Sequence, residues 1–213
     1  PISDDLLPES NGGITALALS PDGITLAIGF RDGTFTLWDT VNNMPRLATI
    51  RAHASALETL AFDNANQYIY TASRDSTINQ WDLTTGTLVQ TMAGHSDWVV
   101  SLSVSPDGKH IASGDRQGFV RLWDVQTGNT LGDPIPILRG FIQSVQFVDD
   151  QTIFATNESA GITTVIDISV DTWLADACKI ANRTLTETEW GQFFPDEPYA
   201  PYCSAHIETA QTP

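Results

Sequence analysis

The sequence predicts an all-β fold built from four repeated units of four short strands, followed by a short helical tail. The first sign is a Trp-Asp pair with spacings of 43 and 42 residues, at Trp38-Asp39, Trp81-Asp82 and Trp123-Asp124. A degenerate fourth copy, Ile166-Asp167, follows 43 residues later. The second sign is Ser-Pro-Asp-Gly at 20–23, which returns at 105–108 after two such periods. Two markers that keep one register indicate an internal repeat.

Each unit contains the pattern of successive short strands. Apolar residues two positions apart share one face of a strand, and such pairs open the units at Leu17 and Leu19, Leu60 and Phe62, Leu102 and Val104, and Val145 and Phe147. Turn residues follow, with Pro setting φ and Gly allowing a tight bend. We expect second strands around 26–28, 69–71, 111–113 and 153–155, and third strands that end at the Trp-Asp position. Fourth strands are expected at 47–50, 88–91 and 135–138.

Units of this kind resemble the WD-repeat family between about residues 10 and 168, most strongly in the second and third copies. The resemblance implies a β-propeller, in which each four-stranded sheet is one blade. We therefore expect blades within residues 1–170, at about 10–40, 53–83, 95–125 and 138–168 with their connecting fourth strands. The tail then comprises residues 171–213.

Four blades are few, because propellers have about four to eight. We therefore expect a partial ring, and three ways of completing it remain open. The chain is part of a longer array, or two copies assemble into an eight-bladed ring, or the four blades close on themselves. Edges of terminal blades that stay unpaired favour association with further strands or blades.

The resemblance also implies a buried row of His, Ser or Thr, Asp and Trp in each blade. The second copy has all four, as His53, Thr71, Asp75 and Trp81. The third has His95, Ser113 and Trp123, with Gln117 at the Asp position, and the first has only Asp32 and Trp38. The fourth has none of them. Because a buried indole N–H needs an acceptor, we interpret these rows as structural rather than catalytic.

A candidate partner-binding surface follows from the turns between second and third strands, which commonly bind partners in this family. The residue before the Asp position is Arg31, Arg74 and Arg116 in the first three copies and Ser159 in the fourth. Arginine binds carboxylates in a bidentate manner. Nearby positions hold Glu58, Trp98 and Phe141, and Trp beside Arg is typical of interface hot spots. The alternative is that each Arg simply pairs with a neighbouring carboxylate.

The tail loses the strand pattern and is predicted to be helical and then irregular. Asp171 is a possible helix cap before Trp173, and 186–189 resembles a capping box before Trp190 and Phe193. The segment 177–186 resembles a tail that follows WD-repeat arrays in large bacterial proteins. That resemblance implies that the chain is the C-terminal part of a signalling, sensor or scaffold protein.

The composition limits the classes of partner that the chain is expected to bind. The net charge of −16, with only ten Lys and Arg, argues against nucleic acid and against an anionic membrane surface. We expect a protein or peptide partner, with an acidic segment as the leading candidate, and a cytoplasmic location because no signal peptide precedes the repeats. Cys178 and Cys203 could be free or bridged.

The leading function is a protein-interaction scaffold or sensor module without cofactor or metal. The alternatives are a propeller enzyme with an active site in its channel and a purely structural assembly unit. The sequence contains no Gly-x-Ser-x-Gly, no His-Glu-x-x-His, no phosphate-binding Gly loop and no zinc-type Cys/His spacing. It therefore predicts no catalytic residues.

Overall fold

The structure, a computed structural model, describes residues 12–137, 140–157, 161–169, 172 and 186–188. It divides into two compact units, Pro1–Ile166 and Asp167–Pro213. Among the described residues of the first unit, the regular structure is entirely β, as predicted. The predicted helices of the tail, and both cysteines, lie almost wholly outside the described residues. The described part of the chain contains no helix long and apolar enough to span a membrane.

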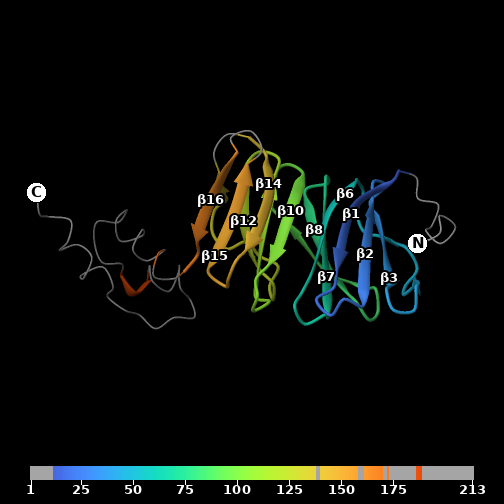
Figure 1. The fold of residues 1–213 in the computed structure, drawn as a ribbon. Helices are drawn as coiled ribbons and strands as arrows, with labels where there is room; N and C mark the ends of the chain where they lie inside the picture. Colours follow the sequence, from blue (N-terminus) through green and yellow to red (C-terminus); the bar gives the residue numbers. More distant parts are fainter. Residues whose placement is uncertain (1–11, 138–139, 158–160, 170–171, 173–185, 189–213) are drawn as a thin grey trace, which may run out of the picture. The chain divides into compact units, whose positions relative to one another are not determined.

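The strands form four antiparallel sheets that follow one another along the chain (Figure 1). The first sheet contains β1 (Ile14–Leu19), β2 (Thr25–Phe30), β3 (Thr34–Asp39), β4 (Met44–Pro45) and β5 (Ile50–Arg51). The second contains β6 (Leu57–Phe62), β7 (Tyr68–Ser73), β8 (Thr77–Asp82) and β9 (Leu88–Ala93). The third contains β10 (Val99–Val104), β11 (His110–Asp115), β12 (Phe119–Asp124) and β13 (Ile135–Pro136). The fourth contains β14 (Ile142–Phe147), β15 (Thr152–Asn157) and β16 (Ile162–Asp167).

The fourth strand of the first sheet differs from the expected single strand at 47–50. Two short pairings replace it, because β4 pairs with the end of β3 while β5 pairs with its start. β4 ends at Pro45, and just beyond it the backbone N–H of Arg46 still donates to Leu37 O over 2.8 Å. The last sheet has three described strands.

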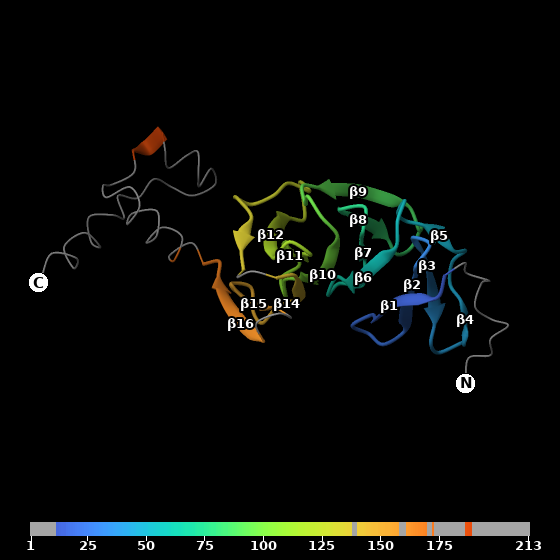
Figure 2. The ribbon, with the colours of Figure 1, turned by 90° about the horizontal axis from the view of Figure 1, so that it is seen from above.

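The first strands of the sheets pack side by side in chain order, β1 against β6, β6 against β10, and β10 against β14. Seen from above, β6, β10 and β14 follow one another, while β9 lies on the opposite side of the array (Figure 2). The core lies between neighbouring sheets. Between the first two, Phe35 and Leu37 of β3 pack with Leu57 and Leu60 of β6. This burial of one sheet by the next is the main source of stability in such arrays.

Aspartates at repeated positions close the turns. Ser20 Oγ donates to Asp22 Oδ1 over 2.6 Å, and Ser105 Oγ donates to Asp107 Oδ1 over 2.7 Å. The Asp of each Trp-Asp pair accepts backbone N–H groups two or three residues later, as Asp82 does from Thr84 and Thr85. Side-chain acceptors of this kind replace missing ladder bonds in a turn. The Asp residues that recur in each repeat therefore have a local structural role in the turns.

Candidate interaction site

The second sheet contains a complete buried row of four side chains. Trp81 Nε1 donates to Thr71 Oγ1 over 3.0 Å, and Thr71 Oγ1 lies 2.8 Å from His53 Nε2. His53 Nδ1 lies 3.1 Å from Asp75 Oδ2. One assignment satisfies every group: Thr71 donates to Nε2, and the Nδ1–H of a neutral imidazole donates to the carboxylate. The row runs from His53, which precedes β6, through Thr71 of β7 to Trp81 of β8, and so links three parts of the second sheet.

Burial sets the charges in this row. Desolvation lowers the pKa of His53, and the neighbouring Asp75 only partly counteracts it. Burial opposes the charge on Asp75, but hydrogen bonds from Thr77 and Ala54 and the nearby His53 hold the pKa of its carboxyl below the usual value. A neutral His53 beside an ionised Asp75 is therefore the state at neutral pH. Thr71 is 0% exposed, so its hydroxyl is engaged within the protein and closed to a substrate.

In the third sheet the carboxylate of the row comes from a residue that sequence reasoning missed. Trp123 Nε1 donates to Ser113 Oγ over 2.7 Å, and Ser113 Oγ lies 2.6 Å from His95 Nε2. His95 Nδ1 then lies 2.9 Å from Asp115 Oδ2. Gln117 occupies the expected Asp position, but the carboxylate of this row does not come from that position. Asp115, the last residue of β11, reaches the imidazole from two positions earlier, and its other oxygen accepts the backbone N–H of Gln117.

The first and fourth sheets lack such a row among the described residues. In the first sheet Asp32 Oδ1 instead accepts from Thr34 N and Oγ1, over 3.0 and 2.6 Å, and Trp38 is buried. In the fourth, Ile166 is buried at the Trp position. Ser159 lies outside the described residues.

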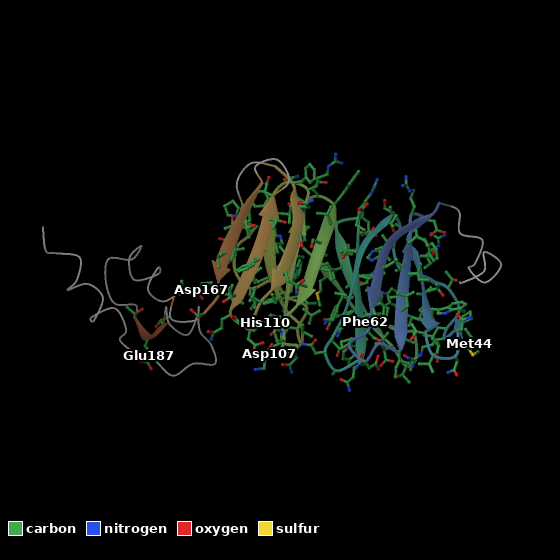
Figure 3. All side chains as sticks on the ribbon, viewed as in Figure 1. Met44, Phe62, Asp107, His110, Asp167 and Glu187 are labelled. Carbon is green, nitrogen blue, oxygen red and sulfur yellow. The ribbon has the colours of Figure 1, made fainter. Side chains whose placement is uncertain are left out.

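The three arginines occupy equivalent places at one end of their sheets. The backbone N–H of each donates over 3.0 Å to the residue before the first strand, from Arg31 to Gly13, Arg74 to Ala56 and Arg116 to Trp98. The turns between first and second strands lie at the opposite end, where Asp107 and His110 are labelled (Figure 3). We call the end that carries the arginines the arginine end.

Two of these arginines stack on one tryptophan. The Arg74 guanidinium carbon lies 4.2 Å from the Trp98 ring centroid, and that of Arg116 lies 4.4 Å from it. Arg74 comes from the turn after β7 and Arg116 from the turn after β11, so Trp98 joins two neighbouring sheets. Cation–π contacts fix the planes of the guanidinium groups. The N–H edges of a stacked guanidinium still point outward in its own plane, available to a planar acceptor.

Glu58 also belongs to this cluster, and it lies in a β-bulge of β6. The pairing of β6 with β7 shifts between Leu57 and Thr59, which leaves Glu58 as the extra residue of a bulge. A bulge re-aims its side chain. Glu58 Oε1 accepts a hydrogen bond from Arg74 Nε and forms an ion pair with it. We call Glu58, Arg74, Trp98 and Arg116 the Trp98 cluster.

Arg31 and Phe141 lie outside this cluster, in the first and fourth sheets. Phe141 is 38% exposed, and Arg31 and Arg116 are also exposed. Within the described part of the chain, neither Arg31 nor Arg116 has a carboxylate within 4.0 Å. Pairing with a neighbouring carboxylate therefore applies to Arg74 alone. Those described residues also contain no group of three or more His, Cys, Asp or Glu that could hold a metal ion.

The four antiparallel sheets, each packed on the next in chain order, define a repeat protein of the β-propeller class. The family model described as "WD domain, G-beta repeat" matches residues 6–39, 44–82 and 86–124, which is more than half of the chain. The chain therefore belongs to the WD-repeat family. This confirms the predicted propeller fold.

Relatives and solved structures agree with this assignment. The chain is 32% identical over 95 residues to nuclear distribution protein PAC1 of Arthroderma otae, a match that covers 41% of this chain and 21% of that protein. It is 32% identical over 96 residues to protein groucho of Drosophila melanogaster, covering 45% and 13%. The chain thus spans about a fifth or less of the length of these curated relatives.

Among solved structures, the computationally designed Ika4 protein has a TM-score of 0.67 at 26% identity, covering 76% of this chain and 96% of that one. U3-55K has a TM-score of 0.64 at 17% identity, covering 75% and 53%, and shows the fold alone. Repeats of this family generally mediate protein interaction and scaffolding.

Proposed function

We propose that this chain is a protein-docking module and that its arginine end captures an acidic segment of a partner protein. The observation that carries the proposal is the Trp98 cluster, in which two arginines from different sheets are held against one half-buried aromatic ring. Aromatic anchors flanked by arginine dominate the binding energy of many interfaces.

The chemistry of the cluster favours a carboxylate ligand. Two guanidinium groups lie over the Trp98 ring, so a ligand carboxylate meets the outward-facing N–H groups of the guanidinium planes. Glu58 already binds the Nε edge of Arg74, and we expect a ligand carboxylate to bind Arg116 through the same kind of contact. Arg31 and Arg116 are exposed and have no carboxylate within 4.0 Å among the described residues, so their charges remain available to an acidic partner.

The test is binding of a fluorescein-labelled oligoglutamate peptide, followed by fluorescence anisotropy. The triple variant R31E/R74E/R116E should bind at least tenfold more weakly, because each lost charge-assisted contact is worth about 1–3 kcal/mol. Raising the salt concentration should weaken binding to the unmodified chain.

The matched control is Lys109→Glu, which makes the same charge change as R116E alone but in the turn before β11, away from the arginine end. Lys109 pairs with Asp107 and its side chain is 75% exposed, so the substitution is expected to leave folding intact. Equal loss of binding in Lys109→Glu and in R116E alone would mean that only net charge matters. Unchanged binding in the triple variant would remove the proposal.

The tail supports a wider role as the sensor part of a larger bacterial signalling protein in the cytoplasm. This rests on the resemblance of segment 177–186 alone, whereas the relatives compared above are eukaryotic. The test is the reading frame that encodes the chain. An effector domain upstream of the repeats supports this role, and a frame that encodes only propeller repeats contradicts it.

A further inference from the structure

The first strand of every sheet has a bulge near its start, and the residue in that bulge differs from sheet to sheet. The pairing skips one residue in each case, at Thr15 in β1, Glu58 in β6, Val100 in β10 and Gln143 in β14. In the first three sheets this residue lies two positions after the one whose carbonyl accepts the backbone N–H of the turn arginine. The four bulges are therefore equivalent, and only Glu58 places a charge there.

The bulge residues differ in what they offer to the arginine of their own sheet. In the second sheet, Glu58 Oε1 accepts a hydrogen bond from Arg74 Nε and the two side chains form an ion pair. In the third sheet the bulge residue is Val100, whose side chain has no acceptor for Arg116. In the first sheet the Thr15 hydroxyl is buried and has no hydrogen-bond partner among the described residues, so it does not bind the arginine of that sheet. The carboxylate at this position is thus a property of the second sheet and not of the repeat.

The neutralised arginine and the open one lie over the same ring. The guanidinium carbons of Arg74 and Arg116 are 4.2 and 4.4 Å from the Trp98 ring centroid. A charge at one of them is felt at the other, because the Debye length is about 8–10 Å at 0.1–0.15 M salt. Glu58 offsets one of the two positive charges through its contact with Arg74. The Trp98 cluster therefore presents one arginine, Arg116, whose charge has no carboxylate partner among the described residues.

We propose that Glu58 makes the Trp98 cluster selective for a single carboxylate over a phosphate group; the proposal rests on the docking function above and names the acidic group that the partner offers. A carboxylate has one charge and two oxygens, which one guanidinium binds in a bidentate contact. A phosphate monoester has a charge of about −1.5 to −2 at pH 7 and three acceptor oxygens, so it needs a second free cation. Arg74 would be that cation, but Glu58 already neutralises it and repels a dianion nearby.

The repeat itself supplies the variants that test this role. Glu58→Gln removes the charge and keeps the shape, and the fourth sheet has Gln143 at the equivalent bulge. Glu58→Thr also removes the reach of the side chain, and the first sheet has Thr15 at that place. The matched control is Asp97→Asn, which removes a carboxylate next to Trp98 in the sequence. Asp97 Oδ1 accepts the Trp98 backbone N–H over 2.7 Å, and Asp97 forms no ion pair among the described residues, so this change frees no guanidinium.

The test is displacement of the fluorescein-labelled oligoglutamate peptide by two unlabelled competitors, followed by fluorescence anisotropy. One competitor is a short glycine–serine peptide with a central glutamate, and the other is the same peptide with a central phosphoserine. On the unmodified chain the glutamate peptide should be the better competitor. On both Glu58 variants the phosphoserine peptide should bind about tenfold more tightly than on the unmodified chain, because a freed guanidinium adds one charge-assisted contact, and it should become the better competitor. Asp97→Asn should keep the order of the unmodified chain.

A phosphoserine peptide that competes better on the unmodified chain overturns the proposal. So does an order that stays the same in both Glu58 variants, or one that reverses in Asp97→Asn as well. Circular dichroism checks that each variant is folded. Arg116→Glu separates this proposal from the docking function: if it leaves binding of the labelled peptide unchanged, the docking function fails and the proposal with it. If it releases the labelled peptide while the order of the competitors is independent of Glu58, the docking function stands and the selectivity alone is refuted.

Discussion

Replacing Thr71 by valine tests whether the buried row in the second sheet holds the sheet together. The two side chains have nearly the same shape, so the substitution removes a hydroxyl and leaves the packing intact. Thr71 Oγ1 is the shared partner of Trp81 Nε1, 3.0 Å away, and His53 Nε2, 2.8 Å away. Trp81 is 6% exposed and His53 is 3% exposed, so water cannot replace the lost partner at either group.

The magnitude follows from these two orphaned groups. Each buried donor or acceptor left without a partner costs about 1–3 kcal/mol, and the added methyl returns about 1 kcal/mol. We expect Thr71→Val to lower the free energy of unfolding by about 2–4 kcal/mol, and Tm by about 5–15 °C for a chain of this size. Urea unfolding followed by tryptophan fluorescence, with a thermal melt, measures both quantities.

Thr15→Val is the matched control, because it makes the same chemical change with the opposite bonding. The Thr15 hydroxyl is buried and has no hydrogen-bond partner among the described residues. Removing an unpaired buried hydroxyl is neutral or stabilising. If Thr71→Val changes Tm no more than Thr15→Val does, the row contributes nothing to stability and the reasoning from its geometry is refuted.

Three further substitutions or conditions test other parts of the fold. Asp115→Asn should cost about 1–3 kcal/mol in urea unfolding because it weakens the acceptor for His95, whereas Gln117→Ala should stay within about 0.5 kcal/mol; equal effects would contradict the assignment of Asp115 to the row. Lowering the pH from 7 to 5 should reduce the free energy of unfolding. The pKa of His53 is lowered in the folded state, so over this range the unfolded chain binds more protons than the folded chain does. A melting temperature that is flat or rises on acidification would refute this. Gly33→Ala should destabilise far more than Gly23→Ala in thermal melts, because a Cβ at Gly33 would lie 2.5 Å from the His53 carbonyl oxygen while one at Gly23 meets nothing within 4 Å; both have positive φ, so similar losses would show that backbone strain alone decides.

The fold was largely predictable because its signals are local and repeated. The Trp-Asp pair and the Ser-Pro-Asp-Gly turn each have a cause within a few residues, since Asp82 and Asp107 bind nearby backbone and hydroxyl groups. The alternation of apolar residues then places each first strand. The fourth strand of the first sheet was predicted at 47–50, but its pairing is divided between β4 (Met44–Pro45) and β5 (Ile50–Arg51). The spacing of apolar residues carries no information on where backbone pairing is interrupted.

The site was less predictable because its contacts cross from one sheet to the next. Spacing alone placed Arg74 and Arg116 at equivalent turns. That Trp98 lies between them depends on the packing of β6 against β10, which no spacing within one unit specifies. Asp115 was missed for a different reason: its contact with His95 lies within the third sheet, but the carboxylate comes from the end of β11, two positions before the place where the family pattern expects it.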